Sequence, residues 1–240
     1  MHKGSGPLLL PNAWDVATAQ AVAGAGFPVI ATTSLAVAAS LGFPDTDTMP
    51  ADVAFAAIAR IARSVDLPVT ADIEAGYQLP AAKLVERLRD AGAVGCNLED
   101  TDHHGPGVLV PVERQVARIR SVREASEAAG VPLVINARVD AFLHDSGEPR
   151  SLLPEAVQRA RAYIEAGADC VYPIFLSDPA TIEAFVQAVQ APVNILLRPD
   201  GPDRQTLARL GVARISMGAG LFRASMTEIG RVLEALRADS

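Results

Sequence analysis

The chain has 240 residues, of which 50% are hydrophobic and 20% are charged, and its formal net charge is −7. This length can bury one large core, as in an α/β barrel, or the cores of two small domains. The acidic balance and the lack of a Lys/Arg cluster exclude nucleic acid and acidic membrane surfaces as expected partners.

The same composition bears on the compartment. No apolar run approaches the roughly 20 residues of a membrane-spanning helix, and the opening leucines at 8–10 are too few for a signal-peptide core. Cys96 and Cys170 lie far apart without a CxxC pattern, which disfavours a disulfide framework and a zinc site. We therefore expect a soluble cytoplasmic protein.

Taken in chain order, Ala-rich helical segments alternate with short β-type runs. A Gly or Pro commonly separates the two, as Gly26 precedes the run at 29 and Pro68 precedes the run at 69. Gly at such a junction suits the left-handed residue that ends a helix. The predicted strands begin at Leu8, Val29, Val69, Val94, Leu133, Cys170, Val193 and Arg214.

The predicted helices fill the intervals between these strands. They span about 15–24, 50–65, 80–91, 111–129, 154–166, 179–189, 204–210 and 219–237. Eight alternations with right-handed crossovers predict the α/β class and a (β/α)8 TIM barrel, with residues 1–240 as a single domain. An open doubly wound sheet is the alternative. The longest loops, 35–49, 100–110 and 141–153, follow strands and are expected on the functional face of the barrel.

The segment 69–77 begins as an apolar strand and ends with two carboxylates and a Gly-Tyr turn. Because side chains alternate along a strand, Asp72 and Glu74 point the same way. Two buried like charges repel unless a cation lies between them, and a hard divalent ion such as Mg²⁺ would relieve that repulsion. A solvated rim of neighbouring carboxylates is the alternative.

Polar residues stand at the ends of nearly all the predicted strands, which a barrel brings around one pocket. The acids and the arginine among them favour a metal ion and an anionic substrate. The set includes Asn12, Thr33, Ser34, Asp72, Glu74, Tyr77, Asn97, Glu99, Asp100, Asn136, Arg138, Asp140, Asn194, Arg198 and Ser216.

Missing residue types narrow the chemistry. The only lysines, Lys3 and Lys83, lie outside the predicted strands, which excludes a Schiff-base aldolase. None of the four histidines lies on a strand in a metal-ligand pattern. We therefore expect Mg²⁺, or Mn²⁺, bound by oxygen ligands, rather than zinc.

Several short motifs occur in order along most of the chain: PNAWD at 11–15, TTSL at 32–35, LGFPD at 41–45, PVTADIEAGY at 68–77, GCNLED at 95–100, NARVD at 136–140 and GVARIS at 211–216. Placed at the ends of predicted barrel strands, this set resembles the isocitrate lyase/phosphoenolpyruvate mutase superfamily. The resemblance implies enzymes that act on 2-oxo acids or their enol forms. In these enzymes Mg²⁺ stabilises an enolate while a C–C or P–C bond breaks or forms.

The resemblance also implies which residues hold the metal. The superfamily's Mg²⁺ is bound, directly or through water, by acids that match Asp45, Asp72, Glu74 and Glu99. We assign Asp72, Glu74 and Glu99 to the metal and place Asp45 on the substrate side.

Further residues are expected to bind the substrate. Backbone amides of Thr33, Ser34 and Leu35 match the turn that holds a carboxylate or oxyanion. Arg138 matches an arginine that pairs with a substrate carboxylate or phosphonate during catalysis, and a structural ion pair with a neighbouring acid is the alternative. Two barrel asparagines, Asn136 and Asn194, complete the predicted substrate-binding set.

The chain departs from the superfamily in the loop after the fourth strand. C–C lyases of the superfamily carry a catalytic cysteine there, in a Lys-Cys-Gly-His type loop, whereas residues 99–107 of this chain read EDTDHHGPG. The candidate proton donors are therefore His103, or its neighbour His104, and Tyr77. A solvated loop histidine and a tyrosine that only packs are the alternatives.

Three functions remain open from the sequence. The first is a Mg²⁺-dependent lyase or decarboxylase of a small 2-oxo or 2-hydroxy carboxylic acid. The second is a mutase or hydrolase of a phosphonate such as phosphonopyruvate, which the short loop disfavours. The third is a barrel that binds a dicarboxylate without turnover. We expect the first, with a small carboxylic acid as the partner molecule.

We also expect a homo-oligomer, dimer or tetramer, although the C-terminal helices that relatives exchange between subunits are shortened or missing here.

Overall fold

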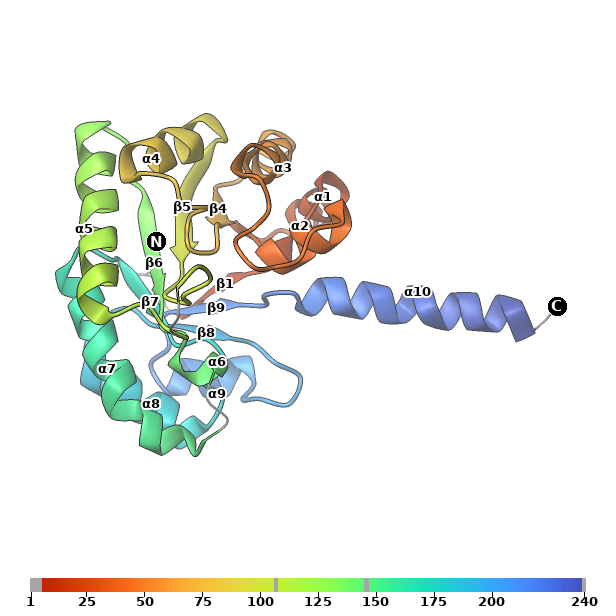
Figure 1. Ribbon diagram of the computed structural model, residues 1–240. Coiled ribbons are helices and arrows are strands. Elements are labelled where there is room, and N and C mark those ends of the chain that lie inside the picture. Colours follow the sequence, from red (N-terminus) through yellow and green to blue (C-terminus); the bar gives the residue numbers. More distant parts are fainter. Residues whose placement is uncertain (1–5, 106–107, 145–146, 239–240) are drawn as a thin grey trace.

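Parallel strands form the centre of the molecule in the computed structural model, which describes residues 6–105, 108–144 and 147–238. Six strands follow one another in the order β2-β3-β4-β5-β6-β7, and three more pair as β1-β9-β8. Only Pro11 separates β1 (Leu8–Leu10) from β2 (Asn12–Ala13), so these two segments act as one barrel strand that belongs to both sheets. A parallel bridge between Val171 and Val193 joins β7 to β8. The sheet therefore closes on itself as the predicted TIM barrel (Figure 1).

The remaining strands lie close to their predicted positions. They are β3 (Ile30–Thr32), β4 (Val69–Asp72), β5 (Ala93–Leu98), β6 (Val134–Arg138), β7 (Cys170–Tyr172), β8 (Asn194–Leu196) and β9 (Arg214–Ser216). Inside the barrel, Asn136 donates a hydrogen bond to Asn97 at 2.8 Å, and Asn194 donates one to Ser216 at 3.1 Å. These contacts confirm that Asn97 and Asn136 point inward from neighbouring strands.

Most helices pack around the outside of the strands (Figure 1). They are α1 (Val16–Gly24), α3 (Ala51–Arg63), α4 (Ala81–Asp90), α5 (Val112–Ala128), α7 (Pro149–Glu165), α8 (Pro179–Val189) and α9 (Arg204–Arg209). Fully buried side chains such as Leu84, Ile119 and Phe185 fill the space between helices and sheet. The helix α7 begins five residues before the predicted start, because Pro149 rather than Pro154 occupies its first turn.

Two short helices lie inside segments predicted as loops. The helix α2 (Ser34–Leu41) begins directly after β3, and α6 (Ala141–His144) begins directly after β6. Both are found at the carboxyl ends of strands, where a barrel builds its site. Their shortness explains why the spacing of apolar residues gave no helical signal.

The last helix, α10 (Gly220–Ala238), leaves the barrel and projects away from it (Figure 1). None of its residues is buried. An edge-to-face contact between Trp14 and Phe222, with ring centroids 5.2 Å apart, holds its first turn against the barrel. Across the described residues, no helix is both long enough and apolar enough to cross a membrane.

Candidate active site

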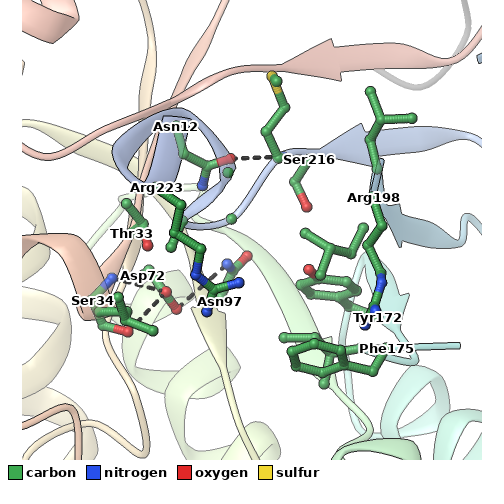
Figure 2. Close-up of a pocket in the computed structure, with 18 of the residues that line it drawn as sticks. Asn12, Thr33, Ser34, Asp72, Asn97, Tyr172, Phe175, Arg198, Ser216 and Arg223 are labelled. Carbon is green, nitrogen blue, oxygen red and sulfur yellow. Dashed lines mark hydrogen bonds between the residues drawn. The ribbon is translucent and has the colours of Figure 1, made fainter. Parts of the chain in front are cut away.

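Asp72 ends strand β4 and is held by the first turn of α2. Its Oδ2 atom accepts hydrogen bonds from the backbone amide and the hydroxyl of Ser34, each at 3.0 Å. The amide of Asn97 lies 3.5 Å from its Oδ1 atom. Both contacts are fixed by neighbouring strands, so the carboxylate of Asp72 has a defined position at the mouth of the barrel (Figure 2).

Glu74 follows in a strained turn. Its φ of 49° lies in the left-handed region, which costs a non-glycine residue on the order of 1–3 kcal/mol. The side chain is only 2% exposed, and one carboxylate oxygen accepts a hydrogen bond from the backbone amide of Asp47. The other oxygen, Oε1, has no hydrogen-bond partner among the described residues. Burial and the nearby acids Asp45 and Glu99 raise the pKa of Glu74 to about 8.

Glu99, directly after β5, contacts a guanidinium and an imidazole. Its carboxylate forms an ion pair with Arg138 and contacts the ring of His103. The guanidinium of Arg138 also donates two hydrogen bonds of 2.9 Å to Asp140. Burial alone would lower the pKa of Arg138, but Asp140, Glu99 and Asp72 raise it above its ordinary value. Arg138 lines the cavity while its charge is balanced by protein carboxylates.

Asp45 adds a further acid to this corner. Burial, followed by repulsion from Asp72, raises the pKa of Asp45 to about 6. Glu99 also contributes to this increase, so Asp45, Asp72 and Glu99 are close enough for their charges to interact. Such mutual repulsion in a buried corner favours a bound cation.

A cavity of about 440 Å³ opens beside these acids (Figure 2). Polar residues that line it include Thr33, Ser34, Asp45 and Asp72, and further lining residues come from the carboxyl ends of β6, β7, β8 and β9 and the segments that follow them. The apolar lining residues include Leu143, Ile174, Phe175, Leu196 and Met217. A cavity of this size suits a small organic molecule with a charged end and an apolar end.

The start of α2 supplies backbone donors to this cavity. Thr33 is the N-cap residue of α2, and Ser34 and Leu35 form its first turn. All three residues line the cavity. Anion binding by this turn stays a prediction, and the amide of Ser34 already donates to Asp72. The first amides of a helix have no carbonyl partner within the helix and attract an anion.

Six predicted site residues do not line the cavity: Glu74, Glu99, His103, Tyr77, Asn136 and Asn194. The ring of Tyr77 packs edge-to-face against Phe55, with centroids 6.0 Å apart, and burial raises its pKa far above the ordinary value. Asn136 and Asn194 are fully buried on strands β6 and β8. The roles of Tyr77 and these two asparagines in catalysis and substrate binding stay predictions, and the structure shows each of them in a packing or hydrogen-bonding role.

The loop after β5 turns both of its histidines toward acids. His103 contacts Glu99, and Nε2 of His104 lies 2.8 Å from Oδ2 of Asp47. Hydrogen bonding to Glu99 outweighs burial and raises the pKa of His103. Gly105 donates a backbone hydrogen bond of 2.7 Å to Asp102, which shapes the turn that carries the two rings. The two residues that complete this loop, 106–107, lie outside the described residues.

Sequence reasoning missed three residues of the site. Asp47 is 3% exposed and receives a hydrogen bond of 2.9 Å from the amide of Tyr77 in addition to its contact with His104. Phe175 carries the guanidinium of Arg198 over its ring at 5.2 Å. Arg223 reaches the cavity from α10, and within the described chain it has no ion-pair partner. Asp47, Phe175 and Arg223 belong to loops or to a distant helix, and no local pattern pointed to them.

The acids fit a divalent cation. Glu74, Glu99 and His103 each offer one ligand atom, and these atoms lie within 4.8 Å of one another. The unpartnered Oε1 atom of Glu74 gives this group a buried oxygen that a cation would satisfy. Asp45 interacts electrostatically with both Asp72 and Glu99, and acids beyond the direct ligands of a cation commonly bind its coordinated water.

The fold and the site together define a TIM barrel with an acidic cation site next to an amide-lined anion site. The sequence model of the phosphoenolpyruvate phosphomutase family matches residues 1–237. The chain belongs to this family.

Solved and characterised relatives are similar over most of their length. A crystal structure from Burkholderia cenocepacia J2315, provisionally described as a phosphonomutase, is 39% identical with a TM-score of 0.91, and the match covers 97% of this chain and 96% of that one. A protein assigned as a 2-methylisocitrate lyase in Corynebacterium glutamicum is 32% identical over 237 residues, 93% of this chain and 74% of its own. Phosphonopyruvate hydrolase in complex with oxalate and Mg²⁺ is 26% identical with a TM-score of 0.84, covering 97% and 83%. The relatives are thus lyases, mutases and hydrolases.

Proposed function

We propose that the protein is a divalent-metal-dependent lyase or decarboxylase of a small 2-oxo or 2-hydroxy carboxylic acid, acting through an enolate. The observation that carries this proposal is the convergence of Asp45, Asp72, Glu74 and Glu99 beside a cavity with a helix N-terminus on its wall. A cation there, Mg²⁺ or Mn²⁺, would polarise the substrate carbonyl and offset the negative charge that develops when the adjacent bond breaks.

The protein's own groups orient the substrate. The start of α2 favours a substrate carboxylate, because Thr33, Ser34 and Leu35 line the cavity at this helix N-terminus. The amide of Ser34 already donates to Asp72, so the amides of its neighbours would make the contact. Arg223 reaches the same cavity and supplies a cation for a second anionic group. Arg198 is less available, because it donates hydrogen bonds of 3.0 and 2.8 Å to Asp200.

The apolar wall indicates the rest of the substrate. Ile174, Phe175, Leu196 and Met217 are among the residues that line the cavity. Contact with an alkyl group of the substrate would bury these apolar side chains, which is favourable. They have no hydrogen-bonding groups for a polar substituent at the same place. We therefore propose an acid that carries a short alkyl substituent, such as an alkylmalate.

The absence of a cysteine or lysine acid bears on the reaction. Residues 99–107 contain neither, and Cys96 is fully buried with a pKa that burial raises to about 12. A neutral thiol sealed in the core cannot deliver a proton to a substrate. Decarboxylation, or a cleavage protonated by another group, fits this chain better than the cysteine-assisted reaction.

The test is a product assay with purified protein and added Mg²⁺ or Mn²⁺. Oxaloacetate, a series of alkylmalates and phosphonopyruvate are supplied separately, and release of a 2-oxo acid is followed. Turnover of oxaloacetate or an alkylmalate supports the proposal. Ligand-induced thermal stabilisation with no product from any of these acids would instead indicate a binding protein.

A second candidate is cleavage of a P–C bond in a phosphonate. It is favoured by the similarity to phosphonopyruvate hydrolase and by Arg198 and Arg223, two of the three arginines that line the cavity. In the same assay, release of inorganic phosphate from phosphonopyruvate, with no reaction of the other acids, would establish this candidate in place of the first.

We also propose that the protein is a homo-oligomer. The helix α10 exposes an apolar stripe to solvent, formed by Met226, Ile229, Val232, Leu233 and Leu236. A single helix with such a stripe is not stable on its own in water, since most helical stability comes from packing. A second copy of the chain, with its own exposed α10, supplies a surface that covers the stripe.

A further inference from the structure

The loop after β5 brings a nitrogen ligand into a site that sequence reasoning assigned to oxygen alone. His103 lies in this loop rather than on a strand, so the pattern of strand residues does not indicate it as a ligand. In the structure its Nε2 atom contacts Oε1 of Glu99, and its side chain is 14% exposed. A ligand atom of Glu74 lies within 4.8 Å of those of both residues.

We propose that the cation site of this protein consists of Glu74, Glu99 and His103, and that the imidazole makes it selective for Mn²⁺ and other transition metals over Mg²⁺. This assignment builds on the proposed metal-dependent activity and specifies its cofactor. It also replaces the predicted role of His103 as a proton donor with a role as a ligand.

Two observations support a ligand at this position. Three ligand atoms of a kind that metals bind lie within 4.8 Å of one another. Independently, Oε1 of Glu74 is buried and has no hydrogen-bond partner among the described residues, although the residue is 2% exposed. A buried carboxylate oxygen without a partner is costly, and coordination to a cation satisfies it.

The ligand types decide which cation is favoured. Mg²⁺ prefers oxygen ligands and gives up its water reluctantly, so an imidazole adds little to its binding. Mn²⁺, Co²⁺ and Zn²⁺ accept imidazole nitrogen readily. A site with two carboxylates and one imidazole therefore binds the transition metals more tightly than a site with carboxylates alone.

The backbone of the loop places the ring of His103 at this site and the ring of His104 outside it. The amide of Asp102 donates a hydrogen bond of 3.0 Å to the carbonyl of Val108, which pairs the two sides of the loop. His104 points to Asp47 instead, with its ring centroid 6.3 Å from that of His103. His104 is thus a matched control, one residue away in the same loop but outside the ligand group.

The test measures metal binding by the full chain without substrate. Titration of Mn²⁺ and of Mg²⁺ into wild type, His103→Ala and His104→Ala gives the dissociation constants, and electron spin echo spectroscopy of bound Mn²⁺ detects a coordinated nitrogen. We expect the nitrogen signal in wild type and His104→Ala but not in His103→Ala. We also expect the Mn²⁺ dissociation constant of His103→Ala to rise at least about tenfold, with that of Mg²⁺ nearly unchanged.

Two results would overturn the assignment. One is the lack of a nitrogen signal in the wild type, a measurement that does not depend on how any variant folds. The other is an equal loss of Mn²⁺ affinity in His103→Ala and His104→Ala, which would show that the loop acts as a whole. Either result leaves the proposed lyase activity standing, and failure of every substrate with a nitrogen signal present would reject the activity alone.

Discussion

Glu74 is the residue at which strain, burial and charge meet. Its backbone is in the left-handed region, one carboxylate oxygen has no partner among the described residues, and its pKa is raised to about 8 by burial and neighbouring acids. Each of these features costs stability in the metal-free protein. Residues at functional sites commonly carry such costs.

The raised pKa of Glu74 predicts how stability changes with pH. In the metal-free protein the folded state holds a proton on Glu74 up to about pH 8, whereas the unfolded state loses it near the ordinary value of 4.5. The folded state thus binds more protons between these values, so the free energy of unfolding falls as pH rises from about 5 to 8. Asp45, with its pKa raised to about 6, adds a slope of the same sign at lower pH.

The measurement is chemical denaturation from pH 5 to pH 8.5 in the presence of a chelator. Glu74→Gln is expected to flatten the decline above pH 6.5, where Asp45 has already titrated. The exposed Glu86, paired with Lys83, provides the control Glu86→Gln, which is expected to keep the wild-type slope. An unchanged slope in Glu74→Gln would contradict the assigned burial of that carboxyl group.

A second prediction at the scale of one residue concerns the effect of Arg223 on KM. It lines the cavity and is unpaired within the described chain, so its charge is available for an anionic group of the substrate. Arg223→Met is expected to raise KM by about 10- to 100-fold, because one charge-assisted hydrogen bond contributes about 1.5–3 kcal/mol. Arg231, on the same helix but paired with Glu228, gives the control Arg231→Met, with KM unchanged. Equal kinetics in the two variants would remove Arg223 from substrate binding.

At the scale of elements, a buried network joins β5 to α7. Asp100 follows β5 and is fully buried, accepting a hydrogen bond of 2.6 Å from Tyr163 and one of 3.2 Å from Arg159. The amide of Asp140 donates a third, at 2.8 Å. This network fixes the ends of β5 and β6, and therefore the positions of Glu99 and Arg138.

Removal of the tyrosine hydroxyl tests this anchor. Tyr163→Phe leaves a buried carboxylate short of one donor, which is expected to lower the free energy of unfolding by about 1–3 kcal/mol. Denaturation in urea measures the loss. A change below about 0.5 kcal/mol would mean that water or another group replaces the hydroxyl, and that the network does not hold α7 in place.

Comparison of prediction and structure separates what sequence patterns can place from what they cannot. Strand ends were predictable, because the Gly or Pro before each apolar run located β4, β5 and β6, and with them Asp72, Glu99 and Arg138. Residues on irregular backbone were not. His103 reaches Glu99 only through the turn after β5, and Asp47 meets Glu74 across 27 positions of sequence. Short helices such as α2 have too few residues for a periodic pattern.

At the scale of the whole molecule, α10 is the feature that a closed barrel does not explain. It has no buried residue, and it displays large apolar side chains, among them Leu233 at 60% and Leu236 at 62% exposed. The proposed oligomer accounts for this surface. It also bears on the site, since Arg223 lies near the start of the same helix.

Charge placed on the stripe tests the oligomer. The double variant Leu233→Glu with Leu236→Glu is expected to shift the protein toward the mass of one chain, 25.1 kDa, in light scattering during size-exclusion chromatography. Glu234→Gln, an exposed change on the same turn, is expected to keep the wild-type mass. A wild-type protein that runs at 25.1 kDa would contradict the proposal directly.

The most direct test of the whole account is the dependence of product release on a divalent ion. The substrate that turns over in the acid panel is assayed after exhaustive chelation, and again after Mn²⁺ or Mg²⁺ is restored. The account predicts loss of product on chelation and recovery with the ion, and no recovery in Glu99→Gln. Undiminished product release after chelation would contradict it, because the reaction would then proceed without a cation bound to the acids at the mouth of the barrel.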